Sequence, residues 1–203
     1  MDKIRAFSST LIPMLIANVD TDQIIPAQFV SSRTTEEFAH ALFRNRRDRD
    51  PEFILDQPAM QGRSIILAGP NFGCGSSREA APWALVAGGI RAVISTGFGD
   101  IFNNNSLKNG LLPIVVSETE HERLRSVAAA DPDVEVTVDL PGNTLSVPAH
   151  GITIELRIDP FYRHLLISGM DELDYLLSHV AEIEQYEAGD AIHPTTRAKL
   201  AGR

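Results

Sequence analysis

The chain is poor in cysteine, and this scarcity excludes several kinds of site. The single cysteine, Cys74, permits no internal disulfide. It cannot by itself hold a zinc ion or an iron–sulfur cluster, because both need several protein ligands. Any metal chemistry would therefore require a partner chain.

Long apolar runs are also missing. Every run is far shorter than the roughly 20 residues needed to span a bilayer, and the first residues, MDKIRAFSSTLIPM, lack a signal-peptide pattern. We therefore expect a cytoplasmic protein without a membrane partner.

Basic residues are outnumbered, with 18 Lys and Arg against 27 Asp and Glu and a net charge of −9. The Arg-rich run RNRRDRD (44–50) is diluted by its own aspartates, so we expect no nucleic-acid partner. The length of 203 residues fits one large domain or two small ones. We expect one domain over 1–189 and a polar tail over 190–203, which is a candidate disordered segment.

Apolar runs alternate with chain breakers, and their spacing predicts a mixed α/β fold with a substantial antiparallel part. Short β-branched runs predict strands within 63–69, 91–96, 111–117, 134–147 (two strands around a Pro-Gly-Asn turn) and 152–158. Helical spacing predicts helices over 34–44, 83–89, 118–130, 160–169 and 171–187. The first of these helices follows a Thr34…Glu37 capping pattern.

The stretch NFGCGSSREAAPWAL (71–85) lies between a predicted strand and a predicted helix, where α/β sheets usually bind ligands. Free amides at a helix start favour an anion, so the backbone of Gly73, Gly75 and Ser76 is a candidate anion hole. A capping box in which Ser76 pairs with Glu79 fits the spacing equally well.

Other motif interpretations fail on detail. A dinucleotide fingerprint needs a third glycine where Arg78 stands, and no G-K-[ST] of a phosphate loop follows. Cys74 is a candidate nucleophile, but a small buried thiol is the commoner outcome. The six histidines show no metal-ligand spacing.

Several uncommon strings occur together: ANVDTDQIIPAQF (17–29), PEFIL (51–55), NFGCGSSRE (71–79) and GGIRAVISTGFGDIFNNNSLKNGLLPIVV (88–116). With these strings, the chain from about residue 5 to 190 resembles the small subunits of 3-isopropylmalate dehydratase, which are similar to the swivelling C-terminal domain of aconitase. The resemblance implies a swivelling β/β/α domain with a mixed sheet and flanking helices.

The resemblance also implies an activity. Enzymes of this family remove water from 2-isopropylmalate and add it back at the neighbouring carbon, a step of leucine biosynthesis. Their four-iron, four-sulfur cluster is held by cysteines of a large subunit. The chain is thus expected to bind no cofactor itself, to need the large subunit, to act on a small dicarboxylate and to be inactive alone.

By the same resemblance, three neighbouring residues carry the chemistry. Ser76 would be the base that takes the proton α to a carboxylate, Ser77 would hydrogen-bond a substrate carboxylate, and Arg78 would bind or neutralise one. A serine alkoxide needs preorganised amides and a nearby cation, so the capping and functional interpretations of the turn can describe the same geometry.

Upstream residues complete the implied site. Asp22 matches an aspartate that faces the aconitase active site, although an Asx turn or a solvated acid is the alternative. Phe29 and Val30 lie where the family selects the substrate side chain, and they are equally plausible core residues. Arg33 is a candidate substrate contact, and a plain surface charge is an equally good interpretation.

Two departures from the family pattern concern the substrate. Ala80 replaces a common histidine, and Asn103 replaces a common aromatic residue. Related small subunits belong to citraconate, maleate and dimethylmaleate hydratases, so these compounds remain alternative substrates. A stand-alone dicarboxylate-binding module is the alternative from another class.

Overall fold

The computed structural model describes residues 3–189. The chain divides into two compact units, Met1–Gly169 and Met170–Arg203, which we describe separately. A single domain over 1–189 stays a prediction, and the expected tail over 190–203 lies outside the described residues. No helix in the described part is long and apolar enough to cross a membrane.

The first unit contains a parallel sheet with the strand order β2-β3-β4-β5. Its strands are β2 (Leu11–Met14), β3 (Ile65–Ala68), β4 (Ala92–Ser95) and β5 (Leu112–Val115). β3 and β4 are buried along their whole length, as expected for strands that are covered on both faces. The strands predicted within 63–69, 91–96 and 111–117 are therefore confirmed.

A second, antiparallel sheet has the order β1-β6-β7-β8. Its strands are β1 (Ala6–Ser9), β6 (Val136–Asp139), β7 (Thr144–Val147) and β8 (Ile152–Glu155). Buried and less buried residues alternate along β6, β7 and β8, which is typical of a sheet with one face on the core. The predicted hairpin within 134–147 is confirmed.

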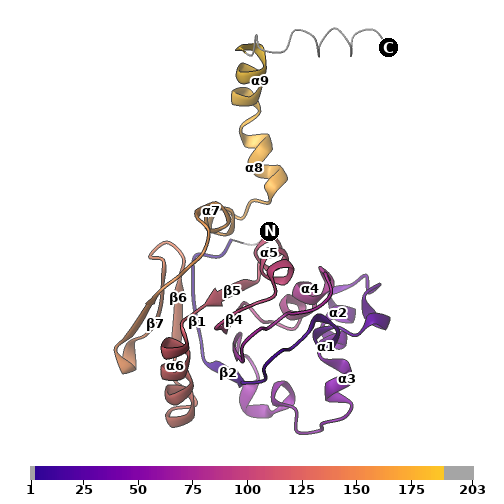
Figure 1. Cartoon of the computed structure of the whole chain (residues 1–203), viewed down its shortest axis with the longest axis vertical. Coiled ribbons are helices and arrows are strands. Elements are labelled where there is room, and N and C mark those ends of the chain that lie inside the picture. Colours follow the sequence, from indigo (N-terminus) through magenta and orange to yellow (C-terminus); the bar gives the residue numbers. More distant parts are fainter. Residues whose placement is uncertain (1–2, 190–203) are drawn as a thin grey trace. The chain divides into compact units, whose positions relative to one another are not determined.

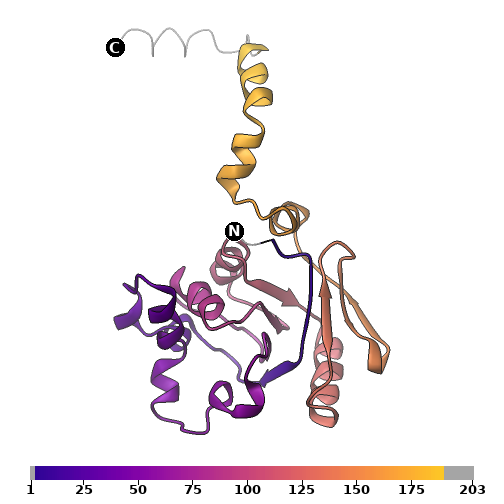
Figure 2. The ribbon, with the colours of Figure 1, turned by 180° about the vertical axis from the view of Figure 1, so that it is seen from behind.

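The parallel sheet separates two hydrophobic cores. Ile65 and Leu67 face a core shared with the antiparallel sheet, whereas Ile66 and Ala68 face a core shared with helices, because successive side chains of a strand point to opposite sides. Figures 1 and 2 show the antiparallel sheet on one side and the helices around α4 (Ala80–Ala87) on the other. This layering is the predicted β/β/α fold class, which is confirmed.

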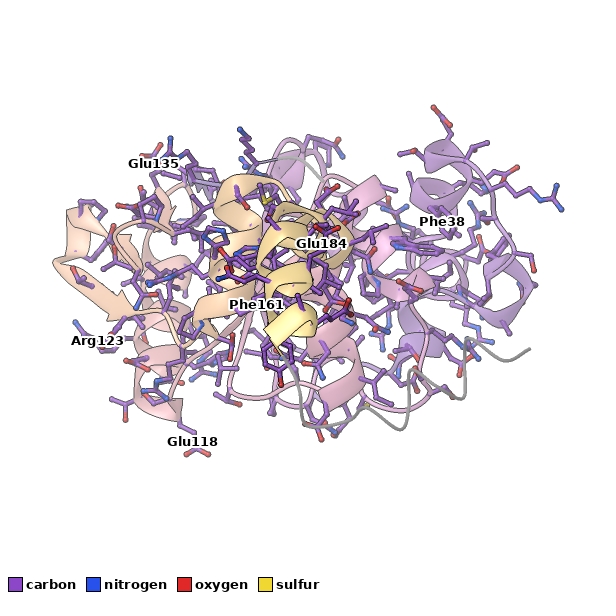
Figure 3. All side chains as sticks on the ribbon, turned by 90° about the horizontal axis from the view of Figure 1, so that it is seen from above. Phe38, Glu118, Arg123, Glu135, Phe161 and Glu184 are labelled. Atoms are coloured by element: carbon purple, nitrogen blue, oxygen red, sulfur yellow. The ribbon has the colours of Figure 1, made fainter. Side chains whose placement is uncertain are left out.

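Two helices of the first unit begin with a capping box. Thr34 and Glu37 form the predicted capping box of α2 (Thr35–Ala41). Ser117 starts α6 (Glu118–Ala130) in the same way, and its backbone and side-chain hydrogen bonds to Glu120 lower the pKa of that carboxyl. Glu118 and Arg123 point outward from α6 (Figure 3). The helices are α1 (Thr21–Ile24), α2 (Thr35–Ala41), α3 (Arg44–Arg47), α4 (Ala80–Ala87), α5 (Asp100–Lys108), α6 (Glu118–Ala130) and α7 (Pro160–Ser168).

The second unit contains two helices where the spacing predicts one over 171–187. They are α8 (Glu172–Ser178) and α9 (Val180–Gly189), and His179 lies between them. The His179 ring nitrogen Nδ1 lies 2.9 Å from the Tyr175 carbonyl oxygen and 2.9 Å from the Ser178 hydroxyl. These contacts use the Tyr175 carbonyl oxygen of α8. They lie where the helix is interrupted between α8 and α9.

Candidate active site

The glycine-rich turn follows β3 and crosses to α4, as the sequence predicts. Gly73 and Gly75 have φ values of +71° and +86°, a left-handed conformation that glycine adopts without steric cost. The Gly73 amide donates to the Val19 carbonyl at 2.7 Å. The expectation that this amide faces an anion is therefore corrected: it is already hydrogen-bonded, because the turn is tied to the strand-like segment before α1.

Gly73 also lies directly against an aromatic ring. A Cβ atom at Gly73 would lie 2.1 Å from Cγ of Phe102, far inside van der Waals contact. We expect Gly73→Ala to lower the free energy of unfolding by about 3 kcal/mol, through overpacking and a strained backbone. Urea unfolding of the purified chain measures this loss.

Gly62→Ala is the matched control. Gly62 also has a positive φ, +79°, but an added Cβ would meet no atom within 4 Å. Its expected cost is only the backbone strain, about 1 kcal/mol. Equal losses in the two variants would contradict the role assigned to the Phe102 contact.

The two serines of the turn do not cap the following helix. α4 begins at Ala80, its N-cap is Glu79 without a side-chain bond, and the Glu79 carboxylate instead accepts from the Asn109 side chain at 3.3 Å. The alternative capping box of Ser76 and Glu79 is thus wrong. Starting the helix at Ala80 puts Pro82 in its first turn, where a missing N–H costs nothing.

Ser76 and Ser77 are exposed. Within residues 3–189, neither hydroxyl has a hydrogen-bond partner, and the amides of Gly75 and Ser76 have no acceptor. These hydroxyls and N–H groups are therefore not used by the described part of the chain. Such a group of donors fits a small anionic ligand.

Thr21 fixes the backbone of the turn. Its buried hydroxyl donates to the Ser76 carbonyl at 2.9 Å, and its amide donates to the Cys74 carbonyl at 3.0 Å. Sequence reasoning did not single out Thr21. The string DTDQIIP that contains Thr21 was the signal that could have found it. No local pattern, however, connects Thr21 to Ser76, which is 55 positions away.

Arg78 is held at one edge of its guanidinium group. Its Nη1 atom forms an ion pair with Asp22 and donates to the Ile25 carbonyl at 3.3 Å. The Arg78 side chain is 19% exposed and that of Asp22 53%. Among the described residues, none accepts a bond from Nε or Nη2 of Arg78, so this edge is open to a ligand.

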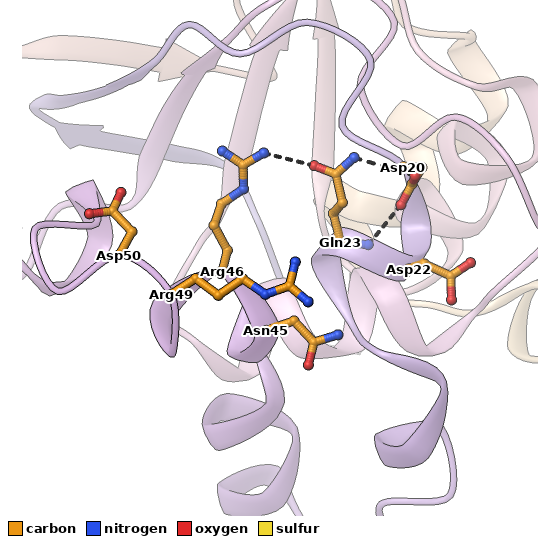
Figure 4. Close-up of a pocket in the computed structure, with 7 residues that line it drawn as sticks. All are labelled: Asp20, Asp22, Gln23, Asn45, Arg46, Arg49 and Asp50. Carbon is orange, nitrogen blue, oxygen red and sulfur yellow. Dashed lines mark hydrogen bonds between the residues drawn. The ribbon is translucent and has the colours of Figure 1, made fainter.

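A cavity of about 480 Å³ adjoins this pair through Asp22 (Figure 4). Gln23 and Arg46 lie in its wall, and Arg46 donates to the Gln23 side chain at 3.0 Å. Arg49 also lines it and has no ion-pair partner in the described part of the chain. The serines do not line this cavity. Asp20 and Asp22 connect it with the turn, because Asp20 forms a parallel bridge with Cys74 and Asp22 pairs with Arg78.

The remaining predicted contacts are more dispersed. Phe29 ends a short 3-10 helix (Ala27–Phe29) and packs partly against the helical core, while Val30 is 37% exposed. Arg33 is exposed and lines a different cavity of about 310 Å³, together with Phe38 and Trp83. The structure thus does not bring Arg33 into the cavity beside Asp22.

Cys74 is half-buried and forms no disulfide. From residue 3 to residue 189, no group of three or more His, Cys, Asp or Glu side chains is placed to hold a metal ion. Of the two departures, Ala80 is buried at the start of α4, and Asn103 is half-buried on α5. Neither residue is one of the exposed groups of the turn.

Comparison with known proteins gives the family. Residues 1–119 match the aconitase C-terminal domain. The chain is 49% identical over 195 residues to the 3-isopropylmalate dehydratase small subunit of Solibacter usitatus (strain Ellin6076), covering 96% of this chain and 97% of that one. The chain belongs to the aconitase C-terminal domain family, among the 3-isopropylmalate dehydratase small subunits.

Other members of the family agree. The small subunit of Rhodopseudomonas palustris (strain BisA53) is 46% identical over 193 residues, which is 93% of this chain and 96% of that one. The crystal structure of 3-isopropylmalate dehydratase from Methanocaldococcus jannaschii matches with a TM-score of 0.64 and 26% identity, covering 91% of this chain and 99% of that chain. The resemblance stated from the sequence is confirmed.

Proposed function

We propose that this chain is the small subunit of a 3-isopropylmalate dehydratase, which interconverts 2-isopropylmalate and 3-isopropylmalate by dehydration and rehydration in leucine biosynthesis. The observation that carries the proposal is identity of 46% and 49% with small subunits of that name over nearly their whole length. The exposed Ser76 and Ser77 and the partly buried Arg78 supply groups suited to the reaction. A cytoplasmic location and a large-subunit partner are parts of the same proposal.

Ser76 is proposed as the base that removes the proton α to a substrate carboxylate. A serine hydroxyl is a weak base, so its alkoxide must be stabilised by nearby donors and positive charge. The free amides of Gly75 and Ser76 and the cation of Arg78 lie in the same turn. Thr21 holds the Ser76 backbone, which keeps the base in place.

Ser77 and Arg78 are proposed to bind a substrate carboxylate. Asp22 occupies Nη1 of Arg78 and leaves the Nε and Nη2 edge for two parallel hydrogen bonds to a carboxylate. Asp22 thereby orients the arginine and faces the bound substrate. We keep Phe29, Val30 and Arg33 as proposed contacts of the substrate side chain, and Val30 offers the most exposed apolar surface of the three.

This chain does not fit an iron–sulfur cluster, because a cluster needs several thiolates and only Cys74 is present. We therefore propose that the four-iron, four-sulfur cluster lies on the large subunit, where it would act as a Lewis acid on the leaving hydroxyl. The part of this chain is to bind the dicarboxylate and move its proton.

Reconstitution tests the proposed function. The chain is mixed anaerobically with the cluster-loaded large subunit from the same genome, and formation of the unsaturated acid from 3-isopropylmalate is followed by absorbance. Turnover is expected only with both chains present. Turnover of citraconate or maleate but not of 3-isopropylmalate would overturn the proposed substrate. No turnover of any of the three with an active large subunit would overturn the proposed function.

The anchor on Ser76 gives a prediction of its own. Thr21→Val removes the hydroxyl that binds the Ser76 carbonyl and keeps the side-chain shape. We expect kcat of the reconstituted enzyme to fall about tenfold through misplacement of the base, and the free energy of unfolding to fall by about 1 kcal/mol. Thr21→Ser, which keeps the hydroxyl, should retain most activity, and an unchanged kcat in Thr21→Val would refute the anchoring role.

A further inference from the structure

Large apolar side chains stay exposed on the second unit. Leu173, Leu176 and Leu177 are 63%, 54% and 60% exposed, and Val180 and Ile183 are each 40% exposed. We call these five residues the C-terminal stripe. Exposed apolar residues scattered singly are ordinary, but a contiguous set marks an interaction surface.

The stripe runs along one side of α8 and α9. Leu173, Leu176 and Leu177 lie at i, i+3 and i+4 on one face of α8, and Val180 and Ile183 lie at i and i+3 on one face of α9. The helices follow each other along the chain with only His179 between them (Figure 1). The Ile183 amide donates to the His179 carbonyl at 3.0 Å, so the helical hydrogen bonding resumes at once.

The two helices lack a core of their own. None of the side chains described in 172–188 is buried, and α8 and α9 contain 7 and 10 residues. Isolated helices shorter than about 12–15 residues are marginal in water, and most helical stability comes from packing of an apolar face. The Asp171–Asp174 capping box fixes only the start of α8. The stripe therefore needs a surface to pack against.

The charges near the stripe indicate what that surface is. Residues 170–189 contain six acidic residues and neither lysine nor arginine. Pairing with the same segment of a second copy would place like charges together, and an anionic lipid surface would repel the segment. Glu184 and Glu187, at i+4 and i+7 from Val180, continue the stripe's side of the helix. The fitting surface is an apolar groove with basic residues near the α9 end.

We infer that α8 and α9 are the docking element that seats this chain in such a groove on the cluster-bearing large subunit. The inference rests on the proposed function, which supplies that partner. Docking through a helix face into a groove is a common mode of recognition. It would bury the stripe and pair Glu184 and Glu187 with cations at the same time.

Binding of the full-length chain to the purified large subunit tests the inference. Leu173→Gln with Leu177→Gln should raise Kd at least a hundredfold, because two buried leucines lose their apolar contact. Ser178→Ala with Gln185→Ala changes the opposite side of the helices and should leave Kd within threefold. Glu184→Lys with Glu187→Lys should raise Kd about tenfold at low salt, and less in 1 M salt, where charge pairs are screened.

The other possible results of this binding experiment would contradict either the proposed partner or the docking element. Absence of binding by the unmodified chain would overturn the proposed partner, whereas equal binding by the parent and the leucine variant would overturn the docking element alone. A clearly lower melting temperature of the free leucine variant would show that the stripe packs within its own chain. A dimer of the free chain that the leucine variant loses would show that a second copy is the occupant, and either result overturns the inference.

Discussion

Ser76→Ala is expected to lower kcat of the reconstituted enzyme about a thousandfold, with little change in assembly with the large subunit. General-base catalysis contributes on the order of 10²–10⁴ in rate, and this contribution is lost with the hydroxyl that is proposed as the base. The exposed Ser76 hydroxyl has no partner in the described residues, so its removal breaks no intramolecular bond. Steady-state turnover of 3-isopropylmalate by the reconstituted enzyme measures the loss.

Ser77→Ala distinguishes the proposed role of Ser77, which is to bind a carboxylate, from the proposed role of Ser76 as the base. Ser77 is equally exposed and adjacent, but it is proposed to hold a carboxylate, so its removal should mainly raise KM. The unfolding midpoints of both variants should match the parent, because neither hydroxyl supports the fold. If Ser76→Ala keeps turnover within tenfold of the parent, the base lies elsewhere.

Local patterns predicted the two strands and the helix that carry the turn, but not α1 and α5, whose residues contact it. The apolar runs at 63–69 and 91–96 are β3 and β4, a parallel pair joined through α4, because strands covered on both faces need continuous apolar sequence. The end of α4 also follows its residues. Gly89 adopts φ +84°, and the Ile90 amide donates to the Leu85 carbonyl at 2.9 Å, which closes the helix in a Schellman motif.

The contacts that organise the site were beyond local patterns. The Gly73–Val19, Ser76–Thr21 and Arg78–Asp22 contacts each join residues more than 50 positions apart. Spacing rules describe neighbours within a helix turn or a strand pair, so they offered only the capping box of Ser76 with Glu79, which does not form. The resemblance to a known family, rather than periodicity, singled out Asp22 and the serines.

The geometry of the turn also explains why it tolerates two unpaired serines. Its strain and close packing are borne by glycines and by Phe102, and its position is set by backbone bonds to Val19 and Thr21. The side chains of Ser76 and Ser77 are therefore not needed to hold the turn in its conformation. A site arranged in this way presents its reactive groups without first breaking bonds, which is the meaning of preorganisation.

Arg78→Lys is expected to lower kcat/KM at least a hundredfold, mostly through a higher KM. A lysine keeps the positive charge and can still reach Asp22, but its ammonium group lacks the planar edge that makes two parallel bonds to a carboxylate. The loss therefore tests the open Nε and Nη2 edge rather than charge alone. Initial rates over a range of 3-isopropylmalate concentrations separate KM from kcat.

The same substitution at Arg125 is the matched control. Arg125 forms an exposed ion pair with Glu122 on α6, and exposed pairs of this kind contribute little to stability. Arg125→Lys should keep kcat/KM within twofold of the parent. If Arg78→Lys behaves like this control, charge alone suffices at position 78, and the two-bond contact with the substrate carboxylate is wrong. A large loss confined to Arg78→Lys would instead support the two-bond contact through the Nε and Nη2 edge, which the ion pair of Nη1 with Asp22 leaves open.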